Sequence, residues 1–149
     1  MLAVPHFRQS SPETCLPACV RMVLAYRGRE HSEHELAEVL GTVRGLGTNP
    51  ESAITGLERM GYHALWFENA TRERLADLLS QNWPVIVFLR AANLPHGHAG
   101  VHAVVLIEID DGQVTCLDPN LDQPLTLKLS VFLSAWKILG NQGLVVWLS

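Results

Sequence analysis

The feature that most constrains the fold lies near the N-terminus, where CLPACVRMVLAYR at residues 15–27 is apolar around nearly its whole helical circumference. A helix with apolar side chains on every face must be buried, so other elements have to cover it. Pro17 marks its start, because proline is tolerated in a helix only within the first turn. Gly28 is a typical residue just beyond a helix C-terminus. The sequence therefore predicts a domain organised around one central helix.

Apolar residues at helical spacing predict three more helices in the first half of the chain, over residues 33–40, 50–60 and 72–81. Each begins at a polar residue, and Ser32 with Glu35 has the pattern of a capping box. The segment HALWF at 63–67 is predicted to be a strand. The first half is thus mainly helical.

The second half predicts strands over residues 84–89, 102–109, 113–118, 124–129 and 143–148, with one short helix over 130–138. Helices first and a mainly antiparallel sheet afterwards is an α+β arrangement. Hydrophobic residues make up 48% of the 149 residues and charged residues 17%, which is enough apolar material for a folded core. No repeat or linker divides the chain, so we predict one α+β domain over residues 1–149.

Charge and hydropathy argue against several functional classes. The net charge is −4 and no basic run is present, so we predict no nucleic-acid binding. The longest apolar runs, such as AVVLI at 103–107, are too short to cross a membrane, and the N-terminus lacks the pattern of a signal peptide. Three cysteines without the spacing of a disulfide scaffold are typical of a reducing compartment. We therefore predict a cytoplasmic protein with no membrane insertion.

Cys15 occupies a special position in the central helix. With Thr14 as the N-cap, Cys15 is the first helical residue. The positive end of the helix dipole and the free N–H groups there favour a thiolate, which is the nucleophilic form of cysteine. A cysteine considered alone is more often a core residue, and we assign Cys19 and Cys116 to the core. Cys15 is a candidate nucleophile that needs catalytic partners.

One of the seven histidines stands out by its place in the chain. His102 is the only histidine at the start of a predicted strand, and the loop before it, PHGHAG, contains His96 and His98. The others lie among polar or terminal residues and are predicted to be exposed; they are His6, His31, His34 and His63. His102 is therefore the candidate general base.

The hairpin that follows His102 brings a carboxylate near it. A three-residue loop, DDG at 110–112 with glycine in the left-handed conformation, pairs Val104 with Asp118. His102 lies two residues before Val104, so His102 and Asp118 are predicted to be diagonal neighbours on one face, with Cβ atoms roughly 7–8 Å apart. A two-residue turn would place the two side chains on opposite faces.

These groups together have the chemistry of nucleophilic catalysis. The imidazole of His102 can take the thiol proton, and the carboxylate of Asp118 can fix the imidazole tautomer and stabilise the imidazolium. Gln9, on an extended segment upstream of Cys15, can supply an N–H to the oxyanion of a tetrahedral intermediate, and the N–H of Cys15 can supply a second. The predicted catalytic residues are Cys15, His102, Asp118 and Gln9.

The same residues resemble a known family, the bacteriocin-processing, double-glycine-leader peptidases, which are papain-like cysteine peptidases. The opening part of the resemblance consists of Gln9, Cys15, Pro17-Ala18-Cys19, Met22 and Tyr26-Arg27-Gly28. His102 at the head of an apolar strand and Asp118-Pro119 after the next strand follow in the family's order. The similarity spans nearly the whole chain.

The resemblance implies a papain-like fold, in which the nucleophile helix packs on an antiparallel sheet. It implies Cys15 as nucleophile, His102 as general base and acid, Asp118 as the residue that orients His102, and Gln9 in the oxyanion hole. Leu16 departs from the family, which often has glycine or alanine after the cysteine. Many family members are also fused to a membrane exporter and its nucleotide-binding domain. The sequence contains neither of these, so we expect a stand-alone peptidase with a peptide or protein substrate, and we expect no cofactor.

Three alternatives remain open from the residues. His96, His98 and His102, with Cys15 or Asp118, could form a metal site, although their spacing matches no known zinc pattern. A second alternative is a non-catalytic module that binds a peptide in the same cleft. A third is acyl transfer or deamidation, because an amine acceptor can use the same triad as water. Our leading prediction includes no metal.

Overall fold

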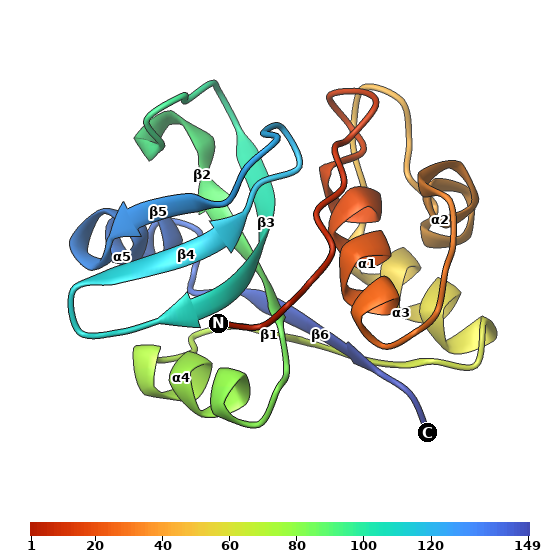
Figure 1. Ribbon diagram of the computed structural model, residues 1–149. Helices are drawn as coiled ribbons and strands as arrows, with labels where there is room; N and C mark the ends of the chain where they lie inside the picture. The colour runs from red at the N-terminus through yellow and green to blue at the C-terminus, as the bar shows by residue number, and fades with distance from the viewer.

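A computed structural model describes residues 1–149 (Figure 1). The helices are α1 (Cys15–Tyr26), α2 (Glu33–Leu40), α3 (Pro50–Arg59), α4 (Arg72–Ser80), the short 3-10 helix η1 (Ala91–Asn93) and α5 (Leu129–Lys137). The strands are β1 (His63–Phe67), β2 (Val85–Arg90), β3 (Val101–Ile109), β4 (Gln113–Leu117), β5 (Leu125–Lys128) and β6 (Gly143–Trp147). The predicted helices and strands are confirmed, with small differences at their ends.

The six strands form one antiparallel sheet in the order β1-β6-β2-β3-β4-β5. Alternate residues of its central strands enter two separate apolar clusters, as the period of two in a strand requires. On β2, for example, Ile86 and Phe88 enter one cluster, whereas Val85, Val87 and Leu89 enter the other. The sheet is therefore buried on both faces, which explains the nearly continuous apolar runs of β2 and β3.

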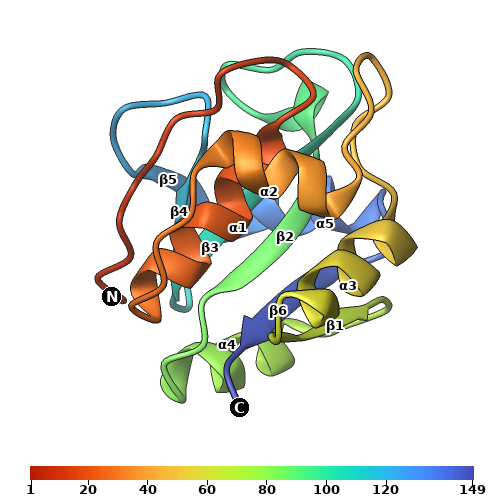
Figure 2. The same cartoon turned by 90° about the vertical axis from the view of Figure 1, so that its right-hand side faces the viewer.

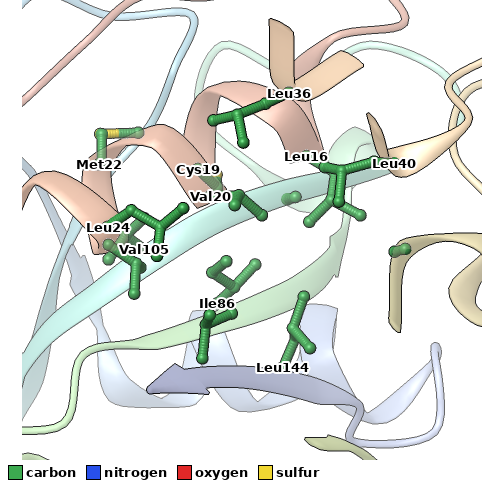
Figure 3. Packing of buried hydrophobic residues seen from close by; sticks show 14 of the residues in the cluster. Leu16, Cys19, Val20, Met22, Leu24, Leu36, Leu40, Ile86, Val105 and Leu144 are labelled. Carbon is green, nitrogen blue, oxygen red and sulfur yellow. The ribbon is translucent and has the colours of Figure 1, made fainter. Parts of the chain in front are cut away.

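Helix α1 has the central position that its composition predicts. It lies against β3 on one side and against α2 on the other, and α3 completes this layer against β1 (Figures 1 and 2). Figure 3 shows Cys19 and Val20 of α1 between Leu36 of α2 and Ile86 of β2. The opposite face of the sheet is covered by α4 and α5. The longest helix has 12 residues, and none has the length and apolar character that crossing a membrane requires.

The ends of several elements meet at one end of the molecule. The start of α1, the β2–β3 connection and the β4–β5 connection all lie at the top of both views (Figures 1 and 2). The N-terminal segment joins them, because the N–H of Gln9 donates to the carbonyl of Pro119 at 2.8 Å. Segments that are distant in sequence thus converge around the first turn of α1.

The β3–β4 hairpin differs from its predicted form. Ile109 pairs with Val114, and the N–H of Asp110 donates to the carbonyl of Gln113, so the turn is shorter by one residue than predicted. A β-bulge between Leu106 and Glu108 then shifts the register by one residue. Beyond the bulge Val105 pairs with Leu117, which is the predicted register. The predicted turn is wrong, but the bulge compensates for it before the strands reach the site.

Candidate active site

Cys15 is the first residue of α1 and is partly exposed. The carbonyl of Thr14 accepts the first intrahelical hydrogen bond, from Ala18 at 3.0 Å, so Thr14 is the N-cap residue. Its hydroxyl does not cap the helix but donates to the carbonyl of Ser11 at 2.9 Å. Pro17 has no N–H, so the first turn keeps only the N–H groups of Cys15 and Leu16 free of intrahelical bonds. The N–H of Leu16 acts on the Cys15 thiol and helps to lower its pKa.

His102 and Asp118 form a buried hydrogen-bonded pair. Nε2 of His102 donates to Oδ1 of Asp118 at 2.6 Å, and the two residues are only 2% and 0% exposed. The remaining ring nitrogen, Nδ1, has no bond to Asp118, and the Cys15 thiol lies close enough to the His102 side chain for each group to shift the pKa of the other. The N–H of Asn120 donates to the same carboxylate oxygen at 2.8 Å. The structure thus binds the imidazole to the carboxylate and places the thiol near the same imidazole.

The surroundings of Cys15 and His102 favour a thiolate beside an imidazolium. Burial raises the pKa of the Cys15 thiol, but the hydrogen bond and charge of His102 and the N–H groups of Ala103 and Leu16 outweigh it and hold the pKa below its ordinary value. Burial lowers the pKa of His102, but its hydrogen bonds to Asp118 and Cys15 raise it to about 9. The two shifts have the same origin, because each charge stabilises the other.

The pKa values of three neighbouring groups, Asp118, Cys19 and Cys116, are also shifted. Burial raises the pKa of Asp118, but hydrogen bonds from His102, Asn120 and His96 and the charge of His102 hold it below its ordinary value. Burial raises the pKa of Cys19 well above its ordinary value, and burial also raises the pKa of Cys116 to about 12. Both of these cysteines are 0% exposed, so their predicted place in the core is confirmed. Cys15 is the one cysteine whose surroundings hold its pKa below the ordinary value.

Gln9 lies beside the site on the segment that precedes α1. One N–H of its side-chain amide donates to the carbonyl of Ser11 at 2.7 Å, while its Oε1 is buried without a partner. An amide group has two N–H donors, so this contact orients the group and leaves one donor free. The backbone bond to Pro119 ties Gln9 to the strand end that carries Asp118.

Two further histidines contact Asp118, and the sequence did not reveal these contacts. Nε2 of His96 donates to Oδ2 of Asp118 at 2.7 Å, and Nε2 of His6 donates to the backbone carbonyl of Asp118 at 2.8 Å. The predicted exposure of His6 is wrong, because the N-terminal segment returns to this strand end. The sequence does place His96 six residues before His102 in a glycine-containing loop, which indicates that the two histidines could lie close together. The same spacing is equally compatible with a metal ligand.

The remaining histidines lie away from the site or at its edge. His31 is another exception to the predicted exposure, since its ring contacts Tyr62 at 2.6 Å and Glu35 at 2.9 Å, and its side chain is 17% exposed. His34 and His63 are exposed as predicted. His98 is exposed, and its ring meets the edge of the His102 ring with centroids 5.4 Å apart.

The alternative metal site is not assembled in this structure. No group of three or more His, Cys, Asp and Glu side chains has an arrangement that could hold a metal ion. Nε2 of His96 and Nε2 of His102 both donate to Asp118, and a donor nitrogen has no lone pair for a metal. The histidine cluster is therefore organised around the carboxylate.

A cavity of about 490 Å³ opens beside Cys15. Its wall includes Leu16, the strand residue Val101, and the stacked rings of Trp66 and Phe88, whose centroids are 4.5 Å apart. Leu46, at 86% exposure, stands at its edge on the connection between α2 and α3. The cavity is mainly apolar and adjoins the thiol, so it can receive the side chains of a ligand that reacts there.

Comparisons with known proteins agree with this architecture. The model of the Peptidase_C39 like family matches residues 1–144. An uncharacterized protein of Methanothermobacter marburgensis is 32% identical over 114 residues, which are 76% of this chain and 70% of the relative. The family match includes Cys15, His102 and Asp118.

Solved structures share the fold at lower sequence identity. A C39-like peptidase candidate of Bacillus anthracis is 18% identical, with a TM-score of 0.79, and the similarity covers 98% of this chain and 95% of the other. The peptidase domain of Streptococcus ComA, a bifunctional ABC transporter of a quorum-sensing pathway, is 18% identical with a TM-score of 0.77, covering 97% and 98%. A double glycine motif protease from an AMS/PCAT transporter, solved with its leader peptide, also has 18% identity and a TM-score of 0.77, covering 99% and 94%. The papain-like fold that the sequence resemblance implied is confirmed.

Proposed function

Because the chain belongs to the Peptidase_C39 like family, we propose that it is a cysteine peptidase that cleaves peptide bonds through the thiolate of Cys15. The observation that carries the proposal is the position of this thiol. It lies on the first turn of α1 near His102, which helps to lower its pKa and whose Nε2 is bound to the buried Asp118. A nucleophile, a base and a group that orients the base are the parts that such chemistry requires.

In the proposed acylation step, Sγ of Cys15 attacks the carbonyl carbon of the peptide bond. A carbon–sulfur bond forms, and the carbonyl electron pair moves onto the oxygen. The intermediate then collapses, the carbon–nitrogen bond breaks, and the imidazolium of His102 gives its proton to the departing amine. The products of this step are a free amine and a thioester on Cys15, with His102 neutral.

Deacylation reverses the role of His102. The neutral imidazole takes a proton from water, whose oxygen attacks the thioester carbonyl. The carbon–sulfur bond breaks, the substrate leaves as a carboxylic acid, and the thiolate–imidazolium pair is restored. Throughout the cycle Asp118 accepts the hydrogen bond from Nε2 of His102, which keeps Nδ1 directed at the sulfur and stabilises the imidazolium.

Two donors are proposed for the oxyanion of both steps. The backbone N–H of Cys15 has no intrahelical partner at the start of α1. Gln9 has a second amide N–H beyond the one that binds the Ser11 carbonyl. A fixed donor in such a place typically contributes about 10²–10³-fold to the rate.

The proposed substrate is a peptide with apolar residues near the bond that is cleaved. The cavity beside Cys15 is bounded by Trp66, Phe88 and Val101, and it opens past the exposed Leu46. These surfaces suit aliphatic or aromatic side chains. The AMS/PCAT relative binds a leader peptide, which supports a peptide ligand for this chain as well. The three free cysteines support a cytoplasmic place of action.

A panel of synthetic peptides tests the proposed function. The panel has two sets of peptides, one with a double-glycine motif and one without it. We expect the wild-type protein to cleave peptides that carry apolar residues before the scissile bond. Mass spectrometry should find two fragments whose summed mass exceeds that of the peptide by one water. An added amine acceptor separates hydrolysis from acyl transfer, since transfer would place the amine on the fragment. A protein that binds peptides but leaves every one unchanged would contradict the proposal in favour of a non-catalytic module.

A further inference from the structure

The carboxylate of Asp118 is held at both of its oxygens by different histidines. Oδ1 accepts from Nε2 of His102 at 2.6 Å and from the N–H of Asn120 at 2.8 Å. Oδ2 accepts from Nε2 of His96 at 2.7 Å and has no other protein partner. Asp118 is 0% exposed, so water cannot readily replace a lost donor. Without His96, one oxygen of a buried carboxylate would have no hydrogen bond, which is a costly arrangement.

His96 is presented by a loop whose backbone is built tightly. The N–H of Gly97 donates to the carbonyl of Leu94 at 3.0 Å, and the N–H of Ala91 donates to the carbonyl of Gly100 at 2.9 Å, which closes the base of the loop. A Cβ on Gly97 would lie 2.5 Å from the carbonyl oxygen of Ala91, so this position requires glycine. The loop therefore holds the residue next to His96 in close contact with η1.

The geometry of the two contacts has a consequence for catalysis. A carboxylate bound at one oxygen can rotate about its Cβ–Cγ bond, whereas a carboxylate bound at both oxygens by groups from separate segments cannot. Its Oδ1 then stays directed at Nε2 of His102, and the ring of His102 stays directed at the thiol. The orientation of reacting groups is a large part of enzymatic rates, and an error of about 1 Å can cost up to about 10²-fold.

We propose that His96 is a positioning residue, which fixes the carboxylate of Asp118 through Oδ2 and thereby fixes the orientation of His102 toward Cys15. The inference rests on the proposed function. It assigns a role to a residue of the β2–β3 loop that neither touches the thiol nor belongs to the triad. It also explains why the middle of this loop carries a partly buried histidine, 26% exposed, that is bonded to the carboxylate.

Two substitutions of similar size test this role. In His96→Gln the side-chain amide nitrogen has the reach of Nε2 and can donate to Oδ2 of Asp118, whereas in His96→Asn the amide is too short. We expect His96→Asn to lower kcat on a peptide from the panel by about tenfold or more, with KM within twofold, because the substrate does not touch this residue. We expect His96→Gln to keep kcat within about threefold of wild type. His34→Asn, at an exposed site on α2, is the matched control.

The rate of Cys15 alkylation by iodoacetamide at neutral pH provides a second readout that needs no substrate. We expect the rate to fall in His96→Asn and to be retained in His96→Gln, with intact mass confirming the labelled site. Equal kcat and equal labelling in the two variants would overturn the inference, as would a loss of thermal stability in His96→Asn without any change in labelling. If replacing His102 left the labelling of Cys15 unchanged, the proposed function itself would fail, which distinguishes the two outcomes.

Discussion

Replacing Cys15 with alanine is expected to abolish peptide cleavage, a loss on the order of 10⁶-fold to the background rate. The substitution removes the only atom that can form the thioester, so no other side chain can substitute for it. Iodoacetamide labelling of the native protein should disappear at the same time, because Cys19 and Cys116 are buried and burial raises the pKa of both thiols. Cleavage is measured by mass spectrometry, and labelling by intact mass.

Cys19→Ala is the matched control for this experiment. It removes a thiol from the same helix, one turn further along, where the side chain packs in the core and not in the site. We expect it to lower thermal stability slightly and to leave cleavage and labelling nearly unchanged. If Cys15→Ala retained cleavage, or if Cys19→Ala lost it while remaining folded, the assignment of the nucleophile would be wrong.

Replacing His102 is expected to have the second largest effect, about 10²–10⁴-fold on cleavage. Without the imidazole no group protonates the leaving amine, and the Cys15 thiol loses both the hydrogen bond and the charge that lower its pKa. Labelling by iodoacetamide at neutral pH should therefore slow as well, although burial of the thiol remains.

Two variants keep this prediction testable if one of them does not fold. His102→Ala removes the His102 donor from the buried carboxylate of Asp118, so that Oδ1 keeps only the N–H of Asn120, and is expected to destabilise the protein. His102→Gln retains an N–H that can reach Oδ1 of Asp118 but cannot carry the proton. Circular dichroism and thermal melting establish that the variant is folded. A folded His102→Gln protein with wild-type cleavage would exclude His102 as general base and acid.

Local sequence patterns predicted most of the fold because local signals determine most of it. The capping hydroxyl of Ser32 accepts from the N–H of Glu35 at 3.0 Å, and Gly41 ends the helix with a φ of 73°, as the residues indicated. The start of α1 at Cys15 follows from Pro17 in the same way. These features depend on residues within one turn of each other.

The details of the site depend on distant contacts that no local pattern contains. The contact between His6 and Asp118 spans 112 residues, and no spacing rule predicts it. The bulge lies between Leu106 and Glu108, where no glycine or other turn-forming residue marks it in the sequence. His102 and Asp118 were nevertheless predicted to be neighbours, because the error in the turn and the omission of the bulge cancel.

The central claim is that the thiol of Cys15 is ionised by its pairing with His102. The most direct test is the ultraviolet thiolate absorbance of the wild-type protein minus that of Cys15→Ala, followed across pH. The difference belongs to Cys15, because burial holds the pKa of Cys116 at about 12 and that of Cys19 well above its ordinary value. We predict a thiolate that appears below the ordinary cysteine range in the wild type and only at higher pH in His102→Gln, since the pairing favours the charged form below the His102 pKa of about 9. A thiol that titrates in the ordinary range or above it, equally in both proteins, would contradict the account.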